Sequence, residues 1–274
     1  MSIRLIATDL DGTLLGADKE ISPRNARALQ ECMARGVHVM LASGRSLNAV
    51  ARIAERAGLT DALVLSSNGA RLDETARGPI LLEDGIERNI AREAAERLIS
   101  AGVYVECYSD DVIYMANRAP VKRHNHRPGR TADGATLFVE DAARFLDEGT
   151  AHARKLIVFS DDPGQLERAR ALMRDLPLDC SSSDTDNLEI LAAGAGKGRA
   201  LTWYAERMNI ARDEIMAFGD QTNDLSLMDA AGWPVAMDNA VGAVKARARL
   251  IAPHHDRSGV AAIVEKYVLE GGLK

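Results

Sequence analysis

The sequence predicts an α/β protein, with a parallel sheet covered by helices on both faces and a second domain of α+β type inserted into it. At both ends of the chain, short continuous apolar segments alternate with longer amphipathic ones. This alternation is typical of parallel strands buried on both faces, with helices connecting them. From about residue 84, strand-like segments in hairpins replace that rhythm, which indicates a different architecture in the middle of the chain.

The first part of the chain predicts three strands, over residues 3–7, 37–42 and 62–65. Ser22 followed by Pro23 indicates a helix start, because a serine cap and a proline at the first helical position suit the unpaired N–H groups there. This helix is expected to end at Gly36, and a second helix is expected over 47–57.

Residues 84–184 predict the inserted α+β domain. Helices are expected over 86–101, 135–146 and 163–176, and strands over 103–108, 112–115 and 155–159. Ser181–Ser183 and Asp184 indicate the returning linker.

After this linker, strands and helices alternate again, with strands expected over 215–218 and 234–237 and helices over 199–208, 225–231, 241–248 and 259–269. We therefore expect residues 1–83 and 185–274 to form one Rossmann-like core.

Composition excludes several classes of protein. The 274 residues are 46% hydrophobic, and 34 basic against 40 acidic residues give a net charge of −6. A mildly acidic chain argues against nucleic acid or an anionic membrane as a partner. Three scattered cysteines, with no CxxC pair, indicate neither a disulfide framework nor a zinc site. The absence of a signal peptide and of an apolar run of about 18 residues predicts a cytoplasmic protein. Nothing in the sequence indicates its oligomeric state.

The strongest motif is the run Asp9-Leu10-Asp11-Gly12-Thr13-Leu14, directly after the first strand. Ligands bind at the carboxyl ends of strands in open α/β sheets, so two carboxylates are expected at a binding site. One of them can attack as a nucleophile while the other transfers protons. Close carboxylates repel each other unless a cation lies between them, which predicts a divalent metal, with Mg²⁺ favoured by oxygen ligands. The alternative is a solvated acidic turn.

Two further segments are typical of phosphate binding. Ser43-Gly44-Arg45 follows the second strand, where a hydroxyl and backbone N–H groups can hold a phosphate oxygen; a serine cap on the next helix is the alternative. Lys197 lies among glycines 194, 196 and 198, at the start of a helix. It can neutralise phosphate charge, although a solvated lysine is the alternative.

The fourth segment contains Asp220, Asn223 and Asp224, after the strand over 215–218. Asp220 is a natural metal ligand, and the other two side chains can bind or orient ligands. The alternative for this segment is that Asp224 caps the following helix.

In this order, the four segments resemble the haloacid dehalogenase superfamily, and more narrowly its Cof-type branch of magnesium-dependent sugar-phosphate phosphatases with a type IIB cap. Further stretches familiar from that branch are Ser67-Asn68-Gly69-Ala70, Leu188-Glu189-Ile190, Met237-Asp238-Asn239-Ala240 and Ser258-Gly259-Val260. The resemblance implies a core phosphatase domain and a cap that sets substrate specificity.

The resemblance also implies a role for each motif residue. Asp9 would be the nucleophile that forms an aspartyl-phosphate, and Asp11 would protonate the leaving oxygen and then activate water. The phosphoryl group would be held by the Leu10 N–H, Ser43, Gly44, Lys197 and Asn223. The Mg²⁺ ligands would be Asp9, the backbone carbonyl of Asp11 and Asp220, with Asp224 in support.

The function expected is hydrolysis of small phosphorylated metabolites, with sugar phosphates as the default class. A phosphomutase on the same scaffold and a non-catalytic sugar-phosphate-binding regulator are the alternatives. A basic stretch of the inserted domain contains Lys122, Arg123 and Arg127. These side chains are candidates for binding the rest of the substrate, and a solvated basic loop is the alternative.

Overall fold

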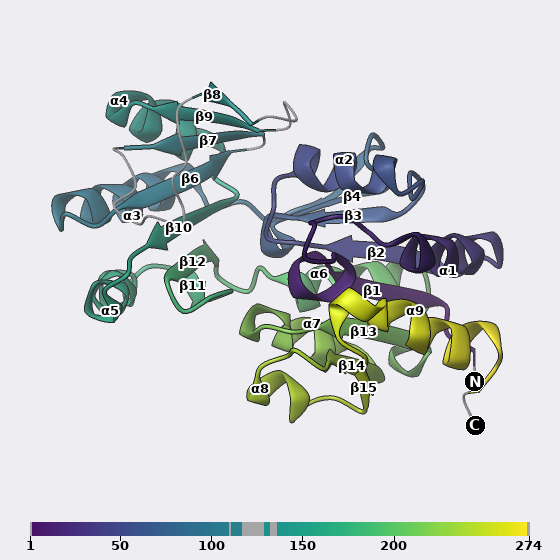
Figure 1. The fold of residues 1–274 in the computed structure, drawn as a ribbon. Helices are drawn as coiled ribbons and strands as arrows, with labels where there is room; N and C mark the ends of the chain where they lie inside the picture. Colours follow the sequence, from purple (N-terminus) through teal and green to yellow (C-terminus); the bar gives the residue numbers. More distant parts are fainter. Residues whose placement is uncertain (1, 110, 117–128, 132–135, 273–274) are drawn as a thin grey trace. The chain divides into compact units, whose positions relative to one another are not determined.

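The chain divides into two units, each built around a sheet of its own (Figure 1). The computed structural model describes residues 2–109, 111–116, 129–131 and 136–272. The first unit comprises residues 1–45, 50–82 and 196–274, and the second comprises 46–49 and 83–195. The α/β class expected from the sequence is confirmed.

The first unit contains an eight-stranded sheet in the order β15-β14-β13-β1-β2-β3-β4-β5. Its parallel strands are β1 (Leu5–Asp9), β2 (His38–Ala42), β3 (Leu63–Ser66), β13 (Ile215–Gly219), β14 (Trp233–Met237) and β15 (Leu250–Ala252). β4 (Arg71–Asp73) runs antiparallel to β3, and β5 (Ile80–Glu83) lies at the edge. Because β1 lies between β13 and β2 and is buried along its whole length, it appears in the sequence as a continuous apolar run.

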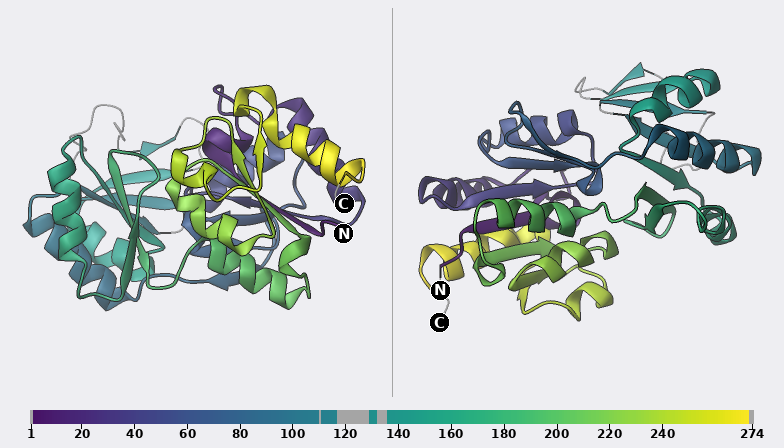
Figure 2. Two further views of the ribbon diagram at one scale, coloured as in Figure 1. Left: turned by 90° about the horizontal axis from the view of Figure 1, so that it is seen from below. Right: turned by 180° about the vertical axis from the view of Figure 1, so that it is seen from behind.

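Helices cover both faces of this sheet (Figure 2). α1 (Pro23–Ala34) packs against α9 (Gly259–Val264) on one face, and α6 (Lys197–Arg207) packs against α7 (Leu225–Ala230) on the other. α2 (Leu47–Arg56) and α8 (Gly242–Lys245) complete the helices. Ser22 caps α1 as expected, since its hydroxyl accepts from the backbone N–H of Asn25.

The second unit contains a seven-stranded sheet in the order β11-β12-β10-β6-β7-β9-β8. The strands are β6 (Val105–Ser109), β7 (Val112–Met115), β8 (Gly129–Arg130), β9 (Leu137–Glu140), β10 (Lys155–Phe159), β11 (Leu178–Ser181) and β12 (Asn187–Ala192). β7 and β9 are parallel, whereas the other pairs are antiparallel. The helices are α3 (Arg88–Ser100), the short α4 (Ala142–Arg144) and α5 (Pro163–Leu172).

Two expectations for the middle of the chain are wrong. The helix expected over 135–146 is instead β9 followed by α4, which begins only after Asp141, whose carboxylate accepts from the N–H groups of Ala143 and Arg144. Residues 185–195 were expected in the core, and 181–184 as the returning linker. In the structure β11 ends at Ser181, and β12 pairs with both β10 and β11. The apolar run of β12 suited either sheet, and strand pairing decided between them.

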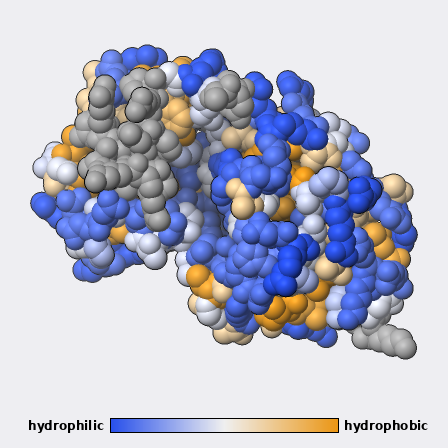
Figure 3. Space-filling view, viewed as in Figure 1, coloured by the Kyte–Doolittle hydropathy of each residue, from blue (hydrophilic) through white to orange (hydrophobic). Residues whose placement is uncertain are grey.

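The surface seen in Figure 3 is mostly hydrophilic. Among the described residues, the large hydrophobic side chains that are exposed are Ile80, Met208 and Ile251, which come from different elements. Within the same residues, no helix combines the length and the apolar character needed to cross a bilayer.

A buried ion pair in the second unit provides a test of its packing. Lys155 Nζ lies 2.8 Å from Glu189 Oε1 and over the ring of Tyr108, and both charged residues are 2% exposed. Glu189→Gln leaves the ammonium buried without its counter-charge, which typically costs about 3–5 kcal/mol. We expect faster hydrogen exchange in β10 and β12, with β1 still protected. Lys155→Met in the same chain should restore part of the protection, and unchanged exchange in Glu189→Gln would contradict this view of the pair.

Candidate active site

The polar motif residues lie at one edge of the first unit's sheet. Asp9 ends β1, Ser43 follows β2 and Asp220 follows β13, and these three strands are parallel. The turn Leu10–Leu14 continues from Asp9 and bends at Gly12, whose φ is +79°. A Cβ at Gly12 would lie 2.4 Å from Asp220 Oδ2. Glycine is therefore required both for the bend and for the close approach of Asp220.

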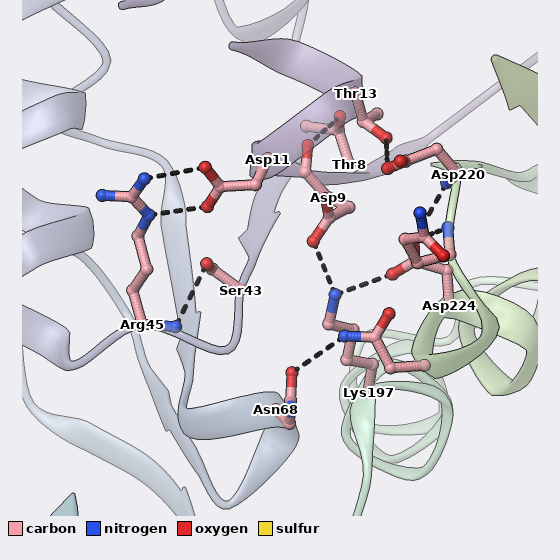
Figure 4. Close-up of polar contacts among 12 residues, drawn as sticks. Thr8, Asp9, Asp11, Thr13, Ser43, Arg45, Asn68, Lys197, Asp220 and Asp224 are labelled. Carbon is pink, nitrogen blue, oxygen red and sulfur yellow. Dashed lines mark hydrogen bonds and ion pairs between the residues drawn. The ribbon is translucent and has the colours of Figure 1, made fainter. Parts of the chain in front are cut away.

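Lys197 joins two of these segments (Figure 4). It is the first residue of α6, and its Nζ donates to Asp9 Oδ1 at 2.6 Å and to Asp224 Oδ1 at 2.7 Å. The side chain is 1% exposed. Burial alone lowers the pKa of the ammonium, but the carboxylates of Asp224 and Asp9 outweigh it and raise the pKa. Lys197 therefore stays charged, and the solvated-lysine alternative is wrong.

Asp9, Asp220 and Asp224 form a buried carboxylate cluster, with one oxygen of each within 4.8 Å of the others. Burial raises the pKa of Asp9 well above its ordinary value; Lys197 opposes this rise, and the carboxylates of Asp224 and Asp220 add to it. The same causes, with Asp224 as the main neighbour, raise the pKa of Asp220 to about 6. Three carboxylates face one ammonium, so a divalent cation would relieve the remaining repulsion. The all-oxygen donor set fits a hard cation of that kind.

Asp224 holds neighbouring parts of the cluster in place through its two carboxylate oxygens. Its Oδ1 accepts from Lys197, and its Oδ2 accepts from the backbone N–H groups of Asp220 at 3.0 Å and Gln221 at 3.2 Å. Asp220 is held further by the Thr13 hydroxyl, which donates to its Oδ1 at 2.8 Å. The side chain of Asp224 thus closes the turn Thr222–Asp224 and also contacts Lys197, but it makes no capping hydrogen bond to α7, so the helix-cap alternative is wrong.

Asp11 is turned away from the cluster toward Arg45 (Figure 4). Arg45 Nε donates to Asp11 Oδ2 at 2.7 Å and an Arg45 Nη donates to Oδ1 at 2.8 Å, while Lys19 Nζ donates to Oδ1 at 3.1 Å. Burial alone raises the pKa of Asp11, but Arg45 and then Lys19 outweigh it and lower the pKa to about 2. In this arrangement the carboxylate is ionised and accepts hydrogen bonds only.

The residues expected to bind phosphate lie around the same edge. Leu10 is buried in the turn after Asp9, and the Ser43 hydroxyl accepts from the Arg45 N–H at 3.2 Å. Asn223 Nδ2 donates to Asn68 Oδ1 at 3.4 Å, and a Cβ at Gly44 would lie 3.0 Å from that same oxygen. Contact with a phosphoryl group stays a prediction for each of them.

The basic side chains expected to bind the rest of the substrate, Lys122, Arg123 and Arg127, lie outside the described residues. Their role stays a prediction.

Sequence reasoning assigned no role to five residues that hold the site together. They are Thr13, Lys19, Arg45, Asn68 and Asn239. Asn239 Nδ2 donates to the Gly12 carbonyl at 2.7 Å, and its Oδ1 accepts from the His255 N–H at 3.2 Å. A signal was present for Asn68 because an Asn-Gly pair after a strand favours left-handed backbone. Asn239 lies in the stretch Met237–Ala240, which resembles the family branch, but nothing in that stretch indicated a contact with Gly12.

Comparison with known proteins places the chain in a family. The family model of haloacid dehalogenase-like hydrolases matches residues 6–264. The chain is 29% identical to a 5-amino-6-(5-phospho-D-ribitylamino)uracil phosphatase of Bacillus subtilis, over 96% of this chain and 98% of the relative. It is also 29% identical to a pyridoxal phosphate phosphatase of Escherichia coli, over 98% and 100%. A haloacid dehalogenase-like hydrolase from B. subtilis superposes with a TM-score of 0.83 at 26% identity, over 96% of this chain and 99% of that one.

The ion pair between Arg45 and Asp11 can be tested directly. Arg45→Met removes two of the donors to the Asp11 carboxylate, so the pKa of Asp11 should rise toward its ordinary value. A pH titration followed by carboxyl ¹³C NMR measures this. Lys19→Met is the matched control, because Lys19 contacts a single oxygen and its side chain is 63% exposed; its effect should be smaller. An unchanged Asp11 titration in Arg45→Met would contradict the assignment.

Proposed function

Since the chain belongs to the haloacid dehalogenase-like hydrolases, and is a phosphatase of that family acting on small phosphorylated metabolites, we propose that it uses Mg²⁺ and forms an aspartyl-phosphate on Asp9. The observation that carries this proposal is the buried contact of Lys197 with Asp9 and Asp224, beside Asp220. A buried nucleophile, a fixed cation and a carboxylate cluster are what phosphoryl transfer needs for positioning and charge neutralisation.

In the first step, a carboxylate oxygen of Asp9 attacks the phosphorus atom while the bond from phosphorus to the leaving oxygen breaks. Lys197 orients Asp9 and opposes the rise in its pKa that burial causes, because Nζ donates to Oδ1 of that residue. Lys197, Ser43, Gly44 and Asn223, with the Leu10 N–H, are proposed to hold the phosphoryl oxygens. As charge develops on the leaving oxygen, it is neutralised by a proton from Asp11, which must first leave Arg45 and take up that proton from solvent.

In the second step, Asp11 takes a proton from water, and the resulting hydroxide equivalent attacks phosphorus and breaks its bond to Asp9. Both proton transfers require the Asp11 carboxylate to leave the bidentate contact with Arg45, since its two oxygens only accept hydrogen bonds there. The described arrangement is therefore a resting one for Asp11, and Arg45 sets the cost of leaving it.

Mg²⁺ fits the carboxylate cluster because the donors are all oxygen and the cluster carries excess negative charge. Asp9, the backbone carbonyl of Asp11 and Asp220 are the proposed ligands, with Asp224 holding Asp220 through its backbone. When bound, the ion would neutralise phosphoryl oxygens and lower the repulsion between Asp9 and Asp220.

The proposed substrates are phosphate monoesters of small polar metabolites, with sugar phosphates as the first class to assay. Two similar proteins support this breadth, since one is named for a phosphorylated ribityl compound and the other for pyridoxal phosphate. The described site contains groups for a phosphoryl group and a cation. Specificity for the rest of the molecule is proposed to come from the second unit.

Asp9→Asn should abolish phosphate release from a panel of phosphorylated metabolites assayed with Mg²⁺. The amide keeps the size of the side chain and an acceptor for Lys197 but is not a nucleophile, so a loss of about 10⁴-fold or more is expected. Acid quenching of the wild type during turnover should trap phosphate on the peptide that contains Asp9.

The control for this variant is Asp61→Asn, which alters an exposed carboxylate just before β3, at the opposite edge of the sheet. It should keep wild-type turnover. Near-normal phosphate release by folded Asp9→Asn would overturn the assignment of the nucleophile.

Asp220→Asn and Asp224→Asn should both weaken Mg²⁺ binding, for different reasons. The first removes a proposed ligand, whereas the second removes a group that holds both Lys197 and the Asp220 backbone. Loss of such supporting contacts typically costs about 10–100-fold in metal affinity. Calorimetric titration of the folded proteins with Mg²⁺ measures the change without relying on turnover. Equal affinities in the wild type and Asp220→Asn would place the metal elsewhere.

A further inference from the structure

The residues Ser67, Asn68 and Gly69, which we name the 67–69 turn, have an unusual backbone. They directly follow β3, and their φ values are +49°, +58° and +98°. Ser67 and Asn68 are 2% and 3% exposed. Left-handed backbone is costly for residues other than glycine, so two of them in succession inside a protein are kept only where the surroundings hold them in place.

The contacts of the 67–69 turn show what holds it. The N–H of Ser67 donates to the Arg45 carbonyl at 2.8 Å, and the N–H of Asn68 donates to the Ser43 carbonyl at 2.9 Å. The turn is therefore bonded to the backbone on both sides of Gly44. A Cβ at Gly44 would lie 3.0 Å from Asn68 Oδ1, so the side chain of Asn68 lies over that glycine.

The same turn packs on the loop that carries Lys197. A Cβ at Gly69 would lie 2.2 Å from the carbonyl carbon of Gly196 and 2.6 Å from the backbone nitrogen of Lys197. No side chain fits between the two backbones, and Gly69 with its φ of +98° is the residue that permits the contact. The position of the 67–69 turn thus fixes where α6 begins, and with it the base of the Lys197 side chain.

A third contact reaches Asn223. Its Nδ2 donates to Asn68 Oδ1 at 3.4 Å. An amide group presents either a donor or an acceptor to a ligand, depending on which way it is turned. With one N–H directed to Asn68, the other N–H of Asn223 is left for an anionic oxygen. The reversed amide would present its carbonyl oxygen instead and repel a phosphoryl group.

We infer that the 67–69 turn is a further part of the phosphate site and that Asn68 is a positioning residue, which turns the amide of Asn223 toward the phosphoryl group and holds Gly44 beside it. This inference rests on the proposed function. The turn contacts each of the three segments that supply the proposed phosphate-binding side chains, at Ser43, Lys197 and Asn223. These contacts are made by a buried segment with left-handed backbone, a conformation that β3 does not need in order to pair in the sheet.

The test uses Asn68→Gly, because glycine keeps the left-handed backbone and removes only the amide. Binding of inorganic phosphate in the presence of Mg²⁺, measured by calorimetry, should weaken about tenfold, since a hydrogen bond to a charged group contributes about 1.5–3 kcal/mol and this one is lost indirectly. Mg²⁺ affinity should stay at the wild-type value, because Asn68 is inferred to act on the amide of Asn223 and on Gly44, which are not among the proposed metal ligands.

The matched control is Asn209→Gly, another asparagine with left-handed backbone, at φ +50° after the end of α6. It should leave phosphate binding unchanged. Asn68→Gly should also have a much smaller effect in Asn223→Ala, because only its contact with Gly44 is then left to lose.

Unchanged phosphate affinity in Asn68→Gly would overturn the inference, as would a parallel loss of phosphate and Mg²⁺ affinity, which would assign the turn a purely structural role. A full additional effect of Asn68→Gly in Asn223→Ala would likewise overturn it. These outcomes differ from failure of the proposed function, in which the wild type itself would neither bind phosphate nor release it from any phosphorylated metabolite.

Discussion

The buried ammonium of Lys197 is the interaction on which the rest of the site depends. It contacts Asp9 and Asp224, which are 188 and 27 residues away in the chain, within an environment almost without solvent. Without this charge, the carboxylate cluster would combine burial with mutual repulsion, and each group would tend to bind a proton instead of a metal or a phosphorus atom. The contact also joins the loop after β1, the start of α6 and the turn after β13, so the electrostatics of the site and the packing of three elements have the same origin.

Asp9 and Asp11 are separated by one residue, yet their surroundings displace their pKa values in opposite directions. Asp9 lies in the buried cluster, where desolvation and the neighbouring carboxylates raise its pKa. Asp11 is partly exposed and paired with Arg45 and Lys19, which lower its pKa to about 2. The two residues lie on either side of Leu10, where the extended backbone of β1 gives way to the turn Leu10–Leu14, and their side chains reach different neighbours. Two carboxylates that are neighbours in the sequence are therefore kept in different environments, one in a buried cluster and the other in an ion pair.

Backbone contacts, rather than side-chain bulk, place the remaining groups. Gly12 allows Asp220 to approach, Gly69 allows the 67–69 turn to pack on Gly196, and Asn239 holds the Gly12 carbonyl. Parallel strands bring these loops to one edge of the sheet. The close approaches are set by the loops themselves. The second unit has a separate core, in which α3 and α5 contribute to one hydrophobic cluster and the ion pair between Lys155 and Glu189 is buried in the sheet.

Much of the first unit's fold and the location of its site could be predicted from the sequence, because the signals for them are local. Continuous apolar runs predicted β1, β2, β3, β13 and β14, Ser22-Pro23 predicted the start of α1, and the position of Asp9, Ser43 and Asp220 just after strands placed them at one edge. The family resemblance assigned their chemistry. Other features depended on partners far away in the chain. Residues 137–140 form a strand because they pair with β7. In the same way, pairing with β10 places β12 in the second sheet. The turn of Asp11 toward Arg45 and the contact of Asn68 with Asn223 are likewise set by tertiary structure, since hydrogen bonds and buried charges depend on distances that local sequence does not encode.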